Sequence, residues 1–233
     1  MKALSICVLC AVLCSVPASA GTLVIGLPAD VGNGNCFPFG CYSGLYQQVY
    51  NSGQFPGTIT ITSLDFYNTE VNELATSTSS GNFLISLSTT SADWNTLSPT
   101  YAANLGSDNT TVFNGSILQP WAFGDTLVIA LTTPFTYNPA DGNLLLTLDA
   151  TDTSNALGQI FFDTNGYNEN YVNGDDFLGR VFGGSTSGYV NSGYGLVTGF
   201  GENTAATPEP SSLILLGSGL FGALGMIRRK IKG

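Results

Sequence analysis

The chain has 233 residues, enough for one sizeable hydrophobic core, and charged residues make up only 9% of it. It contains no His, and Arg180 is the only base between residues 21 and 206, against fifteen acids, so this part has a net charge of −14. Nucleic-acid binding is disfavoured because Lys and Arg clusters bind phosphate backbones. Triads, metal sites and Schiff bases that require His or Lys are excluded from the same part.

Residues 1–20 have the features of a secretory signal peptide. Lys2 precedes an apolar stretch from Ala3 to Val16, and Ala18 and Ala20 supply a small-residue cleavage pattern. We therefore predict that the chain is exported and that the mature protein begins at Gly21.

Two cysteines remain after this leader, Cys36 and Cys41 in the sequence NCFPFGC. In an exported chain, two thiols this close predict one disulfide that closes a small loop. A free or metal-bound pair is the alternative.

Short apolar runs between turn clusters predict β-strands throughout residues 21–205. The clearest runs are 22–27, 57–67, 82–89, 125–132, 143–150 and 158–164, and the weaker ones are 45–50, 111–113, 180–182 and 195–200. Ile59 and Ile61 alternate with threonines, as a sheet with one solvated face requires. Only residues 92–106 could hold a turn or two of helix. We predict an all-β domain, an antiparallel β-sandwich with a jelly-roll-like arrangement.

Residues 163–203 are rich in Gly, Asn and Tyr and predict long loops, where a binding site would lie. Oxygen ligands for calcium are available there from five side chains: Asp163, Asn165, Glu169, Asp175 and Asp176. The spacing does not fit an EF-hand, because Tyr167 and Gly174 occupy its fifth and twelfth positions. A solvated acidic loop without calcium is the alternative, and we expect no cofactor.

The same region contains Tyr167, Tyr171, Tyr189 and Tyr194, whose rings could stack on sugars while their hydroxyls form hydrogen bonds. A carbohydrate-binding module is therefore one hypothesis, and tyrosines that merely cover Gly-rich turns are the alternative. Glu70 and Glu73 could supply the two carboxylates of a glycosidase or lyase. Their separation is not visible in the sequence, so we assign no catalytic residue and expect a protein that is not an enzyme.

Residues 211–227 carry no charge and would form about 26 Å of helix, enough to cross a hydrocarbon core. A basic tail, residues 228–233, follows with Arg228, Arg229 and Lys230. Positive residues remain in the cytoplasm, so the precursor is predicted to be anchored in the inner membrane with its body outside.

Pro208, Glu209 and Pro210 stand just before this apolar segment and its basic end. Together, residues 206–233 resemble the PEP-CTERM sorting signal of Gram-negative bacteria. The resemblance implies processing by the membrane protease exosortase, whereas a simple single-pass anchor is the alternative.

Residues 46–50, 55–67 and 134–150 also look like segments of other exported β-sandwich proteins that carry this signal. The resemblance to this group implies a protein of the cell surface or extracellular matrix, associated with exopolysaccharide.

Overall fold

A computed structural model describes residues 21–27, 34–41, 44–69, 75–154, 159–166 and 176–202. The body, residues 20–203, forms one unit. The predicted signal peptide and the predicted transmembrane helix lie outside the described residues. Within the residues that are described, no helix is long and apolar enough to span a membrane.

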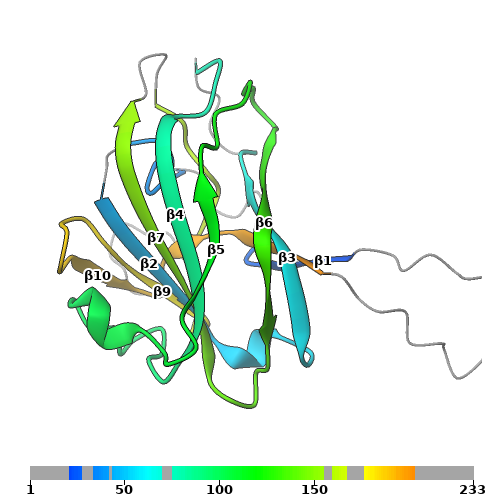
Figure 1. The fold of residues 1–233 in the computed structure, drawn as a ribbon, viewed down its shortest axis with the longest axis vertical. Helices are drawn as coiled ribbons and strands as arrows, with labels where there is room; N and C mark the ends of the chain where they lie inside the picture. The colour runs from blue at the N-terminus through cyan, green and yellow to red at the C-terminus, as the bar shows by residue number, and fades with distance from the viewer. Residues whose placement is uncertain are drawn as a thin grey trace, which may run out of the picture. The chain divides into compact units, whose positions relative to one another are not determined.

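Two antiparallel sheets face each other in the body (Figure 1). The four-stranded sheet has the order β1 (Gly21–Ile25), β12 (Thr198–Glu202), β3 (Ile59–Tyr67), β6 (Thr126–Tyr137). The six-stranded sheet has the order β10 (Tyr189–Ser192), β9 (Leu178–Phe182), β2 (Gly44–Tyr50), β7 (Asn143–Ser154), β4 (Ser80–Thr90), β5 (Thr110–Gly115). A short pair, β8 (Thr164–Asn165) with β11 (Gly195–Leu196), and two 3-10 turns, η1 (Ser52–Gln54) and η2 (Tyr101–Asn104), complete the described elements.

The strand orders are those of a jelly roll. The chain passes between the sheets so that β12 lies between β1 and β3, while β7 lies between β2 and β4. These interleaved neighbours form two sets of four strands, with β9 and β10 added beside β2. The predicted jelly-roll-like sandwich is therefore confirmed.

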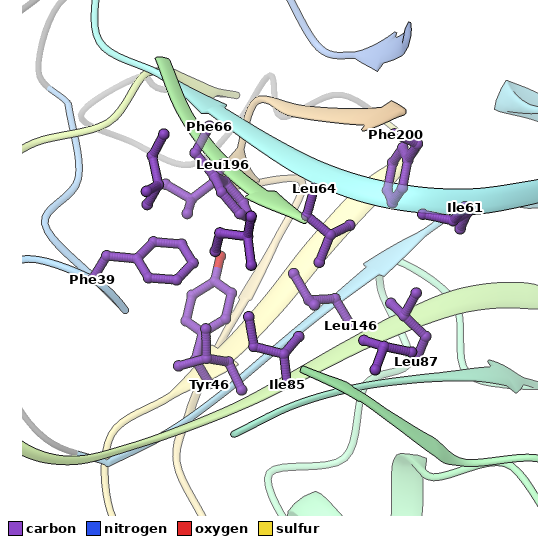
Figure 2. Packing of buried hydrophobic residues seen from close by; sticks show 14 of the residues in the cluster. Phe39, Tyr46, Ile61, Leu64, Phe66, Ile85, Leu87, Leu146, Leu196 and Phe200 are labelled. Atoms are coloured by element: carbon purple, nitrogen blue, oxygen red, sulfur yellow. The ribbon is translucent and has the colours of Figure 1, made fainter. Parts of the chain in front are cut away.

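The core lies between the sheets, and the strand alternation read from the sequence explains which residues fill it. Ile59 and Ile61 are buried as predicted, but a β-bulge after Ile61 shifts the phase, so Leu64 and Phe66 continue the buried face. Figure 2 shows Ile61, Leu64 and Phe66 facing residues of the opposite sheet, including Ile85 and Leu87 of β4.

Two sequence predictions differ from the structure. In the run 158–164, residues 159–163 form no named strand: Phe162 forms an isolated bridge with Asn35, and β8 begins only at Thr164. Conversely, residues 163–203 contain five short strands: the weak runs 180–182 and 195–200 correspond to β9 and to β11 and β12, whereas β8 and β10 lie where only loops were expected. β8 and β10 were missed because they are only two and four residues long, too short to show a period of two.

Candidate functional site

Strands β9 and β10 extend the six-stranded sheet on the side of β2, and β10 carries Tyr189, one of the tyrosines singled out for binding. Register pairs place Arg180 of β9 beside Gln48 of β2 and beside Asn191 of β10. The ring of Tyr194 and the backbone of Leu196 lie against this face. Most of this polar and aromatic region is therefore packed within the protein.

Arg180, the only base of the body, is 6% exposed. Its guanidinium carbon lies 4.3 Å from the ring centroid of Phe182 and 4.3 Å from that of Tyr194. Its Nε donates a hydrogen bond of 3.2 Å to Asn191 Oδ1. Because a buried cation is costly without compensation, the two aromatic faces and this bond indicate a structural role.

A buried hydrogen-bond network joins Gln48 to the same region. Gln48 Nε2 donates to the carbonyl of Leu196 at 2.8 Å, and the Leu196 amide donates back to Gln48 Oε1 at 2.8 Å. The hydroxyl of Tyr46 donates to the same Oε1. Burial raises the pKa of Tyr46, an effect that the nearby Arg180 charge opposes. Tyr46 therefore remains a neutral donor at ordinary pH.

The structure separates the candidate sugar-stacking tyrosines. Tyr194 is only 7% exposed, and its hydroxyl accepts a hydrogen bond of 3.4 Å from Asn35 Nδ2. Tyr189 is 76% exposed, with its ring centroid 6.2 Å from that of Phe182. Tyr167 and Tyr171 lie outside the described residues. Among the described candidates, Tyr189 therefore presents the accessible ring.

An open hollow of about 440 Å³ borders the β9–β10 hairpin that carries Tyr189. Its lining is Gly44, Asp149, Ala150, Thr151, Asp152, Gly184 and Ser185. The Tyr189 ring comes within 3.8 Å of the point that a Cβ on Gly183 would occupy, one residue from this lining. Carboxylates and hydroxyls that line such a hollow are groups that can bind a polyol, but the Tyr189 ring is not part of the lining.

Sequence reasoning missed Asp149 and Asp152. The available signal was the position of Asp149 in NLLLTLDA, where alternation places it on the face opposite the buried Leu146 and Leu148. Asp152 has a φ of 54°, and the residues around it in the sequence do not predict that left-handed conformation.

Two calcium candidates have hydrogen-bonding roles within the fold. Asp163 is 1% exposed, and its two carboxylate oxygens accept bonds of 2.7 Å from the amide and the hydroxyl of Thr69. Asn165 Oδ1 accepts from the amide of Leu27 at 3.4 Å. Asp176 is exposed just before β9.

The remaining candidate acids fall outside the described ranges: Glu169 and Asp175 of the calcium set, and the carboxylate pair Glu70 and Glu73. Over the part of the chain that the structure describes, no group of three or more His, Cys, Asp or Glu side chains could hold a metal ion.

The predicted disulfide between Cys36 and Cys41 is present. Its loop places Phe39 in the core, where the Phe39 ring centroid lies 4.6 Å from that of Phe66 and 5.5 Å from that of Phe162. The disulfide thus closes a loop whose apolar tip is packed between the sheets.

Comparison with known proteins identifies the C-terminal segment. Residues 206–230 match the PEP-CTERM protein-sorting motif, a match that includes the predicted Pro208, Glu209 and Pro210 and the basic Arg228, Arg229 and Lys230. No curated protein and no solved structure matches the chain. The chain therefore carries a PEP-CTERM sorting signal, the mark of an exported protein that exosortase processes, on a body whose described residues are all-β.

Proposed function

We propose that the mature body is a non-enzymatic protein of the cell surface or extracellular matrix, associated with exopolysaccharide. The sorting motif at residues 206–230 carries this proposal, because it directs the body out of the membrane as a product of exosortase. The body's net charge of −14 supports it, since like charge keeps a secreted protein soluble among anionic surfaces. The hydrogen bonds of Asp163 and the aromatic packing of Arg180 also support it, since they give these two charged residues structural roles.

Cell fractionation with mass spectrometry of the C-terminus tests the proposal. We expect the surface and medium fractions to contain a body that begins at Gly21 and ends near Pro208–Pro210. An intact tail ending in Gly233 that dominates outside the inner membrane would show that the segment is a simple anchor. Release of sugars from the producer's exopolysaccharide by the purified body would contradict the non-enzymatic role.

Carbohydrate binding is the second candidate function, and the exposure of the Tyr189 ring favours it. Tyr189 supplies an apolar face for a sugar ring, backed by Phe182 and Arg180. Asp149, Asp152 and Ser185 line a separate hollow, whose oxygens can accept hydrogen bonds from further sugar hydroxyls. We propose that this site requires no calcium.

A binding assay with the producer's own polysaccharide tests this candidate. Tyr189→Ala should weaken binding about ten-fold, which corresponds to about 1.4 kcal/mol of lost stacking. Phe123→Ala is the matched control, because Phe123 is another exposed aromatic residue but belongs to the turn before β6. Equal effects of both variants, or binding abolished by a calcium chelator, would contradict the proposed site.

A further inference from the structure

The first and the last described residues of the body are paired in one sheet. Gly21, at the start of β1, is the register partner of Glu202, at the end of β12. Gly21 is also the residue at which we predict the mature chain to begin. Both ends of the body therefore leave the four-stranded sheet at one corner.

Strand β12 is held firmly at this corner, because it lies between β1 and β3. Phe200 is fully buried, with its ring centroid 5.0 Å from that of Tyr50 and 5.6 Å from that of Phe55. The carbonyl of Gly201 accepts a hydrogen bond of 3.1 Å from the Thr62 hydroxyl. Strand β12 cannot be drawn away from the sheet without breaking these contacts.

The sorting motif begins very close to this fixed strand. Five residues, 203–207, separate Glu202 from Pro208. At a maximum of about 3.5 Å per residue, the chain from Glu202 to Pro208 reaches at most about 21 Å. Any enzyme that cuts near the Pro-Glu-Pro motif must therefore work next to the end of β12 if the body is folded.

We propose that the β1–β12 corner is the surface that the body turns towards exosortase, and that the enzyme cuts the precursor after the body has folded. The short linker 203–207, measured from the locked β12, then limits the reach of the cut site. Residues 198–202 form β12 of the four-stranded sheet and directly precede the linker. An enzyme bound at the motif therefore meets the folded sheet at this corner. This inference concerns processing and holds whatever the mature body binds.

A linker-length series in the full precursor, expressed in cells that contain exosortase, tests the proposal. Residues 203–207 are replaced by Gly-Ser linkers of zero, five or fifteen residues, and mass spectrometry measures the fraction cut. We expect the five- and fifteen-residue linkers to be cut like the natural chain and the zero-residue linker to be cut at least ten-fold less. A cut fraction that does not depend on linker length overturns the proposal.

A second variant tests whether the zero-residue linker fails because the cut site cannot reach the enzyme or because the enzyme itself must bind the linker. Phe200→Ala in the zero-linker precursor should restore cutting, because releasing β12 lengthens the accessible chain by five residues. Leu145→Ala is the control, since Leu145 is equally buried but belongs to a separate cluster with Val49 and Leu97. Failure of Phe200→Ala to restore cutting, or equal restoration by Leu145→Ala, overturns the role of β12.

If the Phe200→Ala precursor is degraded, the linker-length series alone tests the proposal. Both experiments measure the fraction of precursor that is cut, and not where the body goes afterwards. A body that is cut as expected but never reaches the surface would refute the proposed function while leaving this inference intact.

Discussion

The only base of an acidic body lies in its interior. Arg180 is packed between the rings of Phe182 and Tyr194 while the surface of the body keeps its negative charge. A guanidinium suits this position because it is planar, stacks on aromatic faces and is less strongly hydrated than an ammonium group. Arg180 is therefore expected to stabilise the β9 region and not to attract ligands from solution.

Replacing Arg180 with Lys should destabilise the body although the charge is kept. The lost stacking is worth about 2 kcal/mol at a desolvated site, which lowers the melting temperature by roughly 4 to 8 °C in a domain of this size. Calorimetry of the purified body measures this change in melting temperature. Tyr189→Ala, an exposed change on the neighbouring strand, serves as the control and should stay within about 0.5 kcal/mol. Equal melting temperatures for Arg180→Lys and the natural protein would contradict the stacking role.

Asp65 should make stability depend on pH. Burial raises the pKa of its carboxyl, and the hydrogen bond of 3.0 Å from the Ser63 hydroxyl opposes that rise. The folded state then holds the proton to a higher pH than the unfolded state does. The free energy of unfolding therefore falls as pH rises from the unfolded pKa through the folded pKa.

Asp65→Asn should remove this decline and stabilise the body at neutral pH. Urea unfolding at several pH values between 3 and 7 checks it. The prediction would be contradicted if the free energy of unfolding of the natural protein rose with pH through this range and Asp65→Asn were no more stable than the natural protein at pH 7. That result would show that the surroundings of Asp65 favour its ionised form.

At the scale of elements, residues 91–109, between β4 and β5, contain no named strand and cover the outer face of the six-stranded sheet. Gln47 Nε2 donates to the Tyr101 carbonyl at 3.1 Å, and Asn104 Nδ2 donates to Gln47 Oε1 at 2.9 Å. The Tyr101 hydroxyl donates to the Gly183 carbonyl at 2.6 Å. The residues between β4 and β5 are thus tied to both β2 and the end of β9.

Gly179→Ala should loosen this cover. A Cβ on Gly179 would lie 2.2 Å from the carbonyl oxygen of Trp94, and a backbone atom cannot simply turn aside. We expect a loss of about 1 to 3 kcal/mol, measured by urea unfolding. Gly57→Ala is the matched control, because nothing lies within 4 Å of its added Cβ. Equal stability of the two variants would show that the strand shifts freely.

The disulfide should contribute modestly to stability, because its cysteines are only five positions apart. Closing so short a loop reduces the entropy of the unfolded chain enough to stabilise the body by about 2 kcal/mol. The double variant Cys36→Ala, Cys41→Ala should lose that amount in urea unfolding. Reductant should destabilise the natural protein similarly and leave the variant unchanged; no response in either case would contradict the prediction.

At the scale of the whole molecule, the core contains tyrosine hydroxyls as well as hydrocarbon. Burial raises the pKa values of Tyr46, Tyr50 and Tyr137, and it raises that of Tyr101 to about 12. Several hydroxyls have partners in the fold, such as the Tyr137 bond of 2.7 Å to the Gly142 carbonyl. The sandwich therefore depends on these phenols remaining protonated.

Alkaline pH should unfold the body cooperatively. Since the folded pKa values exceed the unfolded value of 10.0, the stability from these groups is complete below pH 10 and is lost as pH rises towards the folded values. Tyrosinate absorbance followed together with circular dichroism measures it. We expect these four phenols to ionise only as the sheet signal disappears. Ionisation of every tyrosine near pH 10 in a folded protein would contradict this.

Much of the architecture could be predicted, and the failures have physical causes. Ile59, Ile61, Phe83 and Ile85 alternate clearly, because large apolar residues recur at the period of a strand. The hollow with Asp149 and Asp152 could not be predicted, since it joins the end of β7 to the β9–β10 hairpin. Tyr189 and Tyr194 look equivalent in sequence, and only packing against Arg180 distinguishes them.

The sequence by itself determined the sandwich class, the disulfide and the sorting signal. Each of these depends on residues close together in the chain: alternating strands, the pair Cys36 and Cys41, and the run from Pro208 to Lys230. The tertiary structure decided that Arg180 is buried, that Tyr189 is exposed and that Gly21 pairs with Glu202. Those outcomes depend on contacts between residues far apart in the chain, which local pattern does not encode.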